Sequence, residues 1–574
     1  MEKRLLKVRN PNRIAFNLNR LVAKRSRRIV TAVLLLTIVV STLCLLIFGH
    51  KAGTYDYTVT PLQDGDNAIQ VTVNIKNAGK NTELKLYKSG IDFYDAGCLN
   101  ADTNGKVAFK EKGDFIIIDP GKHDNLKFSY KAKLGKLDKH GHTGGAYGDM
   151  LAFDGEEAFI LPEYAFSTGD NEIKKHVAGI SVHYNVPKDW ASVIPFSKTA
   201  DNQKYSQLSK PTWADIYDFT KSCFAFGKFK QYTYPQGSGT LQVLVDPASG
   251  LAYTKEVEEG LRSIYKYYSD LFGSTINFSI LILRKDLKDN SYIIGGASTQ
   301  TCGSTFDPDV ARDWQLMGHR FFHAFFDTSV REATFHSPPQ LWFYEGMATY
   351  YENMSMDNLP ESIRRKTGLA SNNGFLTLFK QYLYMRLKDK NLYSVAPMNE
   401  EKVSGYRGIT EFLHYTEAPL VIKAIDDIGY SEYGQHDRLL NYIFSNRGKK
   451  DLSLDELIRY AIGNQAQSFS DSYLYSNALL PLWYLGQNAD DDPGETMQSL
   501  KDIEYTQWTW FRLEDPEYPL DNISDKGLSQ LNAQAEKKIG AFCRRKSGTK
   551  YPEAFTHTLF IAETILSPGR HMRS

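Results

Sequence analysis

The stretch LMGHRFFHAFFDTSVREATFHSPPQLWFYEGMATYY, residues 316–351, carries most of the information about the fold and chemistry of this chain. His319 and His323 are four residues apart, so on a helix their side chains lie on one face, about 40° apart. Two such imidazoles can bind one zinc ion, but a third ligand must come from another element. Glu345 lies 22 residues after His323, in a second helical segment behind a Ser-Pro-Pro turn. A helical hairpin would return it to the histidines.

A zinc ion lies about 2 Å from each of its ligand atoms, so a shared ion would hold the three atoms within about 4 Å of one another. The histidine spacing alone is weak support, because 13 histidines in 574 residues give roughly 0.3 such pairs by chance. A helix with two packed histidines would show the same spacing. Glu332 is a rival third ligand that is nearer in sequence, but it lies in the polar segment VREATF, so we favour Glu345.

The context of the histidine pair resembles the glycyl aminopeptidase-like zinc metallopeptidases of the gluzincin clan. In that family an HExxH helix is followed by a helix of the form WFxEGxTxYY, and FFHAFF followed by LWFYEGMATYY is similar to both. The resemblance extends over residues 55–487. It includes a β domain before the zinc helix, the helix LHYTEAPLVIKAID, and the closing segment SYLYSNALLPLWYL. This resemblance implies a thermolysin-like domain, built from a mixed sheet and a helical half.

The resemblance also implies roles for particular residues. His319, His323 and Glu345 would be the zinc ligands, and zinc would be the cofactor. Gly295 and Gly296 would lie in the strand that binds the substrate.

Tyr415 matches the second tyrosine of the family's YYxKG-type helix. By that resemblance it would donate a hydrogen bond to the oxyanion of the tetrahedral intermediate. Packing in the helical core is an equal alternative for this residue, which is one of 35 tyrosines. Two other positions also depart from the family. Glu417 replaces its Lys, and the family's GGLEH-like segment reads GGAST, with Thr299 in place of a carboxylate.

The largest departure concerns the catalytic base. The family's HExxH reads HRFFH here, so Arg320 replaces the Glu that takes a proton from the attacking water. A guanidinium stays protonated at physiological pH and cannot accept that proton. A cation about 6 Å from the metal would also weaken zinc binding, on the order of a hundredfold.

A membrane anchor is expected near the N-terminus. Residues 29–48 read IVTAVLLLTIVVSTLCLLIF, without a charged side chain, and span about 30 Å as a helix. Residues 1–28 hold ten Lys/Arg and one acidic residue, so the positive-inside rule puts them in the cytoplasm and residues 50–574 outside. We therefore expect a transmembrane helix at 29–49 and a cell-membrane location. A cleaved signal peptide is the alternative, although its apolar region is normally shorter.

Period-two alternation indicates strands in the region that follows. Ile69, Val71, Val73 and Ile75 alternate with polar residues, and NLKFSY and GISVHYNVP repeat the pattern. We expect residues 50–190 to form an antiparallel β-sandwich domain. The region after residue 28 has 58 basic and 66 acidic residues, so it is a poor partner for nucleic acid, and none is expected.

The pattern changes after residue 190. The sequence predicts strands in TLQVLVD and NFSILIL. Apolar residues at helical spacing predict helices over residues 254–271, 309–327, 340–354, 361–388, 408–427 and 453–463. The fold class is thus α+β, with a peptidase-like domain at 191–487 and a C-terminal extension of unknown role at 488–574. The four cysteines outside the membrane segment are scattered and predict no disulfide.

Three functions remain open from the sequence. The favoured one is a membrane-anchored peptidase homologue that has lost catalysis and binds a peptide or protein partner. The second is an active zinc peptidase whose base is another group. The third is a structural ectodomain without a ligand.

Overall fold

The protein is described here by a computed structural model of residues 52–485, except for residues 63–66, 80–82, 89, 136–143, 168, 201–202, 285–292, 296–297, 331–332, 337–339, 389–406, 449–451, 477 and 483–484. The expected membrane helix at 29–49, the basic tail and the extension at 488–574 lie outside the described residues. Among the helices of the described part, none is long and apolar enough to cross a membrane.

The first sheet has seven strands in the order β13-β14-β11-β1-β2-β7-β4. The predicted alternation is confirmed, because the apolar residues of β2 are buried and its polar residues are partly exposed. β7 repeats this pattern. The strands are β1 (Gly53–Pro61), β2 (Ala68–Lys76), β4 (Phe93–Asn100), β7 (Asn125–Lys133), β11 (Val177–Tyr184), β13 (Ser197–Ala200) and β14 (Gln203–Ser209).

The expectation of a purely antiparallel domain is wrong in one respect. β1 pairs with β11 in parallel, with Tyr57 opposite Val182. Side chains alternate in the same way in parallel and antiparallel strands, so the sequence pattern could not distinguish them. The sheet also continues past residue 190, because β14 pairs with β11 and β13 pairs with β14.

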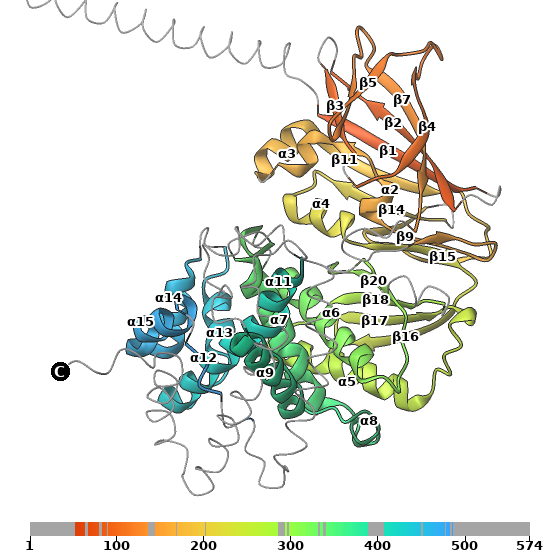
Figure 1. Cartoon of the computed structure of the whole chain (residues 1–574). Helices are drawn as coiled ribbons and strands as arrows, with labels where there is room; N and C mark the ends of the chain where they lie inside the picture. The colour runs from red at the N-terminus through yellow and green to blue at the C-terminus, as the bar shows by residue number, and fades with distance from the viewer. Residues whose placement is uncertain are drawn as a thin grey trace, which may run out of the picture.

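A second sheet, ordered β10-β3-β6-β5, lies against the first (Figure 1). Its strands are β3 (Leu84–Tyr87), β5 (Phe109–Lys112), β6 (Phe115–Ile118) and β10 (Leu161–Pro162). Leu86 and Ile116 of this sheet share one buried core with Val71 and Phe128 of the first sheet. Two sheets with a common core form a sandwich, as predicted.

A third sheet, which we call the middle sheet, is ordered β12-β15-β9-β8. All five residues of β9 (Met150–Asp154) and of β15 (Cys223–Gly227) are buried. Phe153 and Phe224 face the sandwich core and stack 5.3 Å apart. Ala152 faces the opposite way, into a separate core. The middle sheet, completed by β8 (Gly145–Ala146) and β12 (Ala191–Val193), is therefore covered on both faces.

The fourth sheet forms the other side of that separate core. Its order is β16-β17-β18-β20-β19, and its strands are β16 (Lys230–Gln236), β17 (Gly239–Val245), β18 (Asn277–Ile282), β19 (Ile293–Ile294) and β20 (Thr301–Ser304). β17, β18 and β20 run parallel, whereas the edge strands β16 and β19 are antiparallel to their neighbours. The expected mixed sheet is confirmed.

Helices α5 (Lys255–Phe272) and α6 (Ala311–Val330) cover the remaining face of this sheet, and the other helices of this half pack beyond them (Figure 1). Those other helices are α7 (Leu341–Ser355), α8 (Glu361–Thr367), α9 (Ser371–Lys388), α11 (Arg407–Phe412), η6 (Leu413–Glu417), α12 (Ala418–Tyr433), α13 (Arg438–Ser445), α14 (Leu454–Ile462) and α15 (Ala466–Phe469). The helix predicted at 361–388 is two helices, because Gly368 ends α8 with a φ of 72°, outside the helical region.

Candidate metal centre

Helices α6 and α7 pack side by side and bring the histidines to the glutamate. His319 and His323 occupy successive turns of α6 and are 4% and 1% exposed. Glu345 lies in the first turn and a half of α7, where buried aromatic residues fix the helix against the core. The three side chains reach one point although Glu345 follows His323 by 22 residues, as the predicted helical hairpin requires.

The three ligand atoms form a close triangle. His323 Nε2 lies 2.9 Å from His319 Nε2, and Glu345 Oε2 lies 3.3 Å from the first histidine nitrogen and 3.5 Å from the second. Two atoms at about 2.0 Å from one zinc ion, at a tetrahedral angle, are about 3.3 Å apart. The predicted convergence within 4 Å is therefore confirmed, and the residues present fit a zinc ion. Their role as metal ligands stays a prediction.

The three residues of this triangle differ in how their surroundings shift their pKa values. Burial raises the pKa of the Glu345 carboxyl, but the adjacent imidazoles outweigh it and hold that pKa well below its usual range. Burial lowers the pKa of His323. Burial also opposes protonation of His319, yet the carboxylates of Glu345 and Glu352 raise its pKa overall. A carboxylate with two imidazoles is thus ready to bind a cation, and a proton on His319 is the competitor.

Glu352 supports the centre from behind. Its Oε2 lies 3.1 Å from Nδ1 of His319, and its Oε1 accepts a hydrogen bond of 2.8 Å from Arg312. A carboxylate on the far nitrogen of a histidine orients the ring and makes the near nitrogen a better ligand. No sequence motif marks this residue as part of the site. Glu352 follows Glu345 by seven residues, two helical turns, so helical periodicity could have found it.

His323 lies against a second polar group, which no sequence motif indicates. Its ring is 4.5 Å from the ring of Tyr344, whose hydroxyl donates a 2.6 Å hydrogen bond to Asp327. Asp327 also lies 3.1 Å from His336. Tyr217, from α4 (Trp213–Thr220), packs its ring 4.5 Å from His336. A helix that follows the sandwich strands in sequence therefore contributes to the surroundings of the metal centre.

Tyr415 stands beside the triangle, with its ring 5.9 Å from that of His319. It lies in η6, a π-helical segment between α11 and α12. Such single π turns occur frequently at functional sites. Burial and the nearby Glu345 carboxylate raise the pKa of Tyr415 well above its usual range, so its hydroxyl is a donor at neutral pH.

Arg320 follows His319 on α6 and is half-buried. Burial raises the pKa of Tyr415 and of Cys302, and the positive charge of Arg320 lowers both by a smaller amount. The guanidinium therefore lies close enough to Tyr415 and Cys302 to act on both electrostatically. Burial raises the pKa of the Cys302 thiol to about 12, which makes it a poor nucleophile.

The segment that matches the family's substrate-binding strand is fixed by buried carboxylates. Gly295 has a φ of 74°, and a Cβ on it would lie 2.2 Å from the backbone nitrogen of Cys223. Its N–H donates to Asp154. Thr299 donates both its N–H and its hydroxyl to Asp218, at 2.5 and 2.7 Å. The side chain of Thr299 is thus engaged with α4. Gly296 lies outside the described residues.

Two further positions from the sequence analysis are Glu417 and Glu332, and only the first lies within the described residues. Glu417, which replaces the family's Lys, is buried and forms an ion pair with the buried Arg386. Burial raises the pKa of Glu417 despite this partner. The rival ligand Glu332 lies outside the described residues.

A comparison with solved structures shows that similar folds are known. No family model and no curated protein sequence matches the chain. The structure of an aminopeptidase N family protein from Idiomarina loihiensis aligns with a TM-score of 0.57 and 14% identity, over 75% of this chain and 78% of that one. The chain shares the fold of that protein. An M1 zinc metallopeptidase from Deinococcus radiodurans aligns with a TM-score of 0.45 and 15% identity, over 76% of this chain and 96% of that one.

Proposed function

We propose that this chain is a peptidase-fold protein that holds zinc at His319, His323 and Glu345 and binds peptides without hydrolysing them. The observation that carries the proposal is the complete three-residue triangle with a guanidinium on the residue next to His319. Glycyl aminopeptidase-like enzymes, which the sequence resembles, have their catalytic base at that position.

A zinc ion bound by these residues would act as a Lewis acid toward an oxygen ligand. The chain's own groups would do the rest. Glu352 orients His319 through the 3.1 Å contact. The Tyr415 hydroxyl, kept protonated, would donate a hydrogen bond to a carbonyl oxygen beside the metal. Arg320 can donate hydrogen bonds but cannot remove a proton, so it would hold a peptide oxygen without promoting its hydrolysis.

Zinc content and hydrolysis test the proposal together. The full-length chain, purified in detergent, is expected to contain one zinc per chain, and His319→Ala and Glu345→Gln are expected to lose it. A screen with short peptides should give no zinc-dependent hydrolysis above background. Robust hydrolysis by the wild type, abolished by a chelator and by His319→Ala, would show an active peptidase instead.

The proposed location is the cell membrane, with residues 29–49 as the span and the peptidase-fold body outside the cell. The support for this comes from the sequence alone, from the uncharged segment and the basic residues before it. A peptide or protein ligand would then be met on the extracytoplasmic side.

A further inference from the structure

Two aromatic side chains are exposed together at one corner of the sandwich, which we call the aromatic corner. They are Tyr164 and Phe166, which are 43% and 41% exposed and belong to the 3₁₀ turn η1 (Glu163–Phe166). Among the described residues from 52 to 227, no other large hydrophobic side chain is exposed to this extent. Single exposed apolar residues are ordinary on a protein surface, but here both lie in one turn.

The aromatic corner lies beside the start of the sandwich. Strand β1 begins at Gly53 and pairs there with Val177, the residue that directly follows helix α3 (Asp170–His176). The ring of His176 stacks on that of Tyr164, with 3.7 Å between the ring centroids. One stacking contact and one strand pairing therefore connect the corner to Gly53.

The proposed membrane span keeps Gly53 close to a bilayer. The span ends at residue 49, four residues before Gly53. A fully extended chain advances by about 3.6 Å per residue, so Gly53 would lie at most about 14 Å from the end of the span. A single connection of this kind limits the distance of the body from the membrane but leaves the body free to rotate. A second contact beside Gly53 would fix its orientation.

The charges at the aromatic corner are balanced. Each acidic side chain of η1 and α3 pairs with a lysine, in the ion pairs Glu163–Lys85 at 3.4 Å, Asp170–Lys174 at 3.7 Å and Glu172–Lys175 at 3.9 Å. Charge therefore neither attracts this surface to an anionic membrane nor repels it. The two aromatic rings remain as the groups that favour contact, because such rings accumulate at the interface between membrane and water.

From these contacts we infer that Tyr164 and Phe166 insert into the headgroup layer of the membrane that residues 29–49 span, and so hold the body in one orientation. The inference rests on the proposed membrane location. It goes beyond that location by naming a second contact surface and its partner, a lipid surface that is bound through aromatic rings instead of charge.

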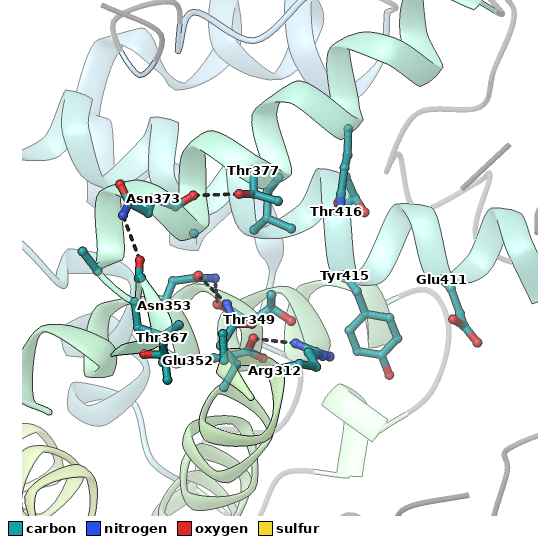
Figure 2. A pocket seen from close by; sticks show the side chains of 18 of the residues that line it. Arg312, Thr349, Glu352, Asn353, Thr367, Asn373, Thr377, Glu411, Tyr415 and Thr416 are labelled. Carbon is teal, nitrogen blue, oxygen red and sulfur yellow. Dashed lines mark hydrogen bonds and ion pairs between the residues drawn. The ribbon is translucent and has the colours of Figure 1, made fainter. Parts of the chain in front are cut away.

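The aromatic corner is separate from the proposed peptide site. A cavity of about 560 Å³ opens beside Tyr415, between helices α6, α7, α9 and α11 with η6 (Figure 2). It adjoins the candidate metal centre, because the ring of Tyr415 lies 5.9 Å from that of His319. Neither residue of the corner lines this cavity, and Figure 1 shows α3 and the helices around the cavity in different halves of the protein. Lipid contact and ligand binding would therefore use different surfaces.

Photo-crosslinking of the full-length chain in lipid vesicles tests the inference. The photoreactive residue p-benzoylphenylalanine, which forms bonds with nearby C–H groups on irradiation, replaces Tyr164 or Phe166, and lipid adducts are measured by mass spectrometry. Tyr475 is the matched control position, because it is 46% exposed in the helical half. Thr377, in the cavity wall, reports whether the cavity faces the bilayer. We expect lipid adducts at positions 164 and 166 and only background at 475 and 377.

One further variant and a change of lipid assign the contact to the aromatic rings. With the photoreactive residue at position 164, Phe166→Ser should lower the adduct yield by up to about tenfold, because an apolar ring leaves the interface. Tyr475→Ser removes a similarly exposed ring elsewhere and should leave the yield unchanged. Vesicles of phosphatidylcholine, with or without phosphatidylglycerol, should give equal yields, since the charges at the corner are balanced. A circular dichroism spectrum identical to that of the wild type shows that each variant is folded.

A photoreactive residue in place of Leu36, inside the proposed span, separates this inference from the location on which it rests. Adducts at position 36 without adducts at 164 and 166 would overturn the inference alone. Equal adduct yields at 164, 377 and 475 would also overturn it, because the body would then have no fixed orientation. Yields that require phosphatidylglycerol would show that charge makes the contact instead of the rings. Absence of adducts at position 36 would overturn the proposed location as well.

Discussion

At the residue scale, Arg320 and Glu352 place opposite charges next to the candidate metal centre. Glu352 lies 3.1 Å from the outer nitrogen of His319, where a carboxylate strengthens a metal ligand. Arg320 places a positive charge near Tyr415. The proposed zinc affinity of His319, His323 and Glu345 would therefore depend on these two neighbours.

The first prediction concerns Arg320. Arg320→Glu should raise zinc affinity on the order of a hundredfold, because it replaces a repelling cation with a carboxylate. Arg320→Gln should raise it less, since only the cation is removed. Competition with a chelator of known affinity measures both. Hydrolysis that appears in Arg320→Glu but not in Arg320→Gln would identify residue 320 as the missing base. Unchanged zinc affinity in both variants would mean that the guanidinium does not act on the metal.

Glu352→Gln should lower zinc affinity about ten- to a hundredfold, because the amide is a weaker acceptor for the outer nitrogen of His319. The same chelator competition measures this effect. Glu361→Gln provides the control, as an exposed carboxylate with the same change of charge. Equal zinc affinities for the two variants would contradict a supporting role for Glu352.

Zinc affinity should also depend on pH. The carboxylates near His319 raise its pKa above the ordinary value of 6.5 despite burial. Without metal, the protonated form stabilises the fold below pH 6.5, and this contribution is lost as the pH rises through the raised pKa. Zinc must displace that proton, so its affinity should keep rising with pH above 6.5 and level off only above the raised pKa. Zinc titrations at several pH values measure this. A plateau already reached at pH 6.5 would contradict it.

At the scale of elements, the short helix α4 fixes two parts of the site. Tyr217 packs on His336, next to the group that surrounds His323. The next residue, Asp218, accepts hydrogen bonds from Thr299 and Gln300. Adjacent residues of one helix thus hold the aromatic group near the metal and the segment that leads into β20.

Asp218→Ala should destabilise the protein by about 2–4 kcal/mol, because it removes a buried carboxylate that accepts three hydrogen bonds from the partly buried Thr299 and Gln300. Urea unfolding of the full-length chain measures the change. Asp189→Ala is the control, since Asp189 is 65% exposed and pairs with an exposed lysine. It should cost less than about 1 kcal/mol. A loss for Asp218→Ala no larger than for the control would show that the segment is held by other contacts.

Sequence periodicity predicts local features well and distant ones poorly. His319 and His323 lie on one face of a helix because they are four residues apart. Glu345 comes close to them because a single turn joins its helix to theirs. Both are therefore visible in the sequence. Asp154 and Asp218 lie 141 and 81 residues from the groups they bind, so nothing in their own neighbourhood indicates the contact. The parallel pairing of β1 with β11 leaves no trace in the sequence, because side chains alternate in the same way in parallel and antiparallel strands.

At the scale of the whole molecule, the orientation of the chain across the membrane can be tested directly. A protease added outside intact cells should digest the body and spare a fragment that contains residues 1–49. The physical reason is the basic N-terminal segment, which is retained on the cytoplasmic side. Immunoblotting with an N-terminal tag detects the fragment. Recovery of a mature chain that begins after residue 48 would show that the segment is a cleaved signal peptide.

The middle sheet determines whether the candidate metal centre can be isolated from the rest of the protein. A fragment that begins at residue 230 would keep His319, His323 and Glu345. It would lose the layer that covers Leu244 and Leu281, because those side chains are buried against the middle sheet. The uncovered sheet face would then be free to associate with other copies of the fragment. The candidate centre therefore cannot be separated from the middle sheet, whose two faces pack on both halves of the protein.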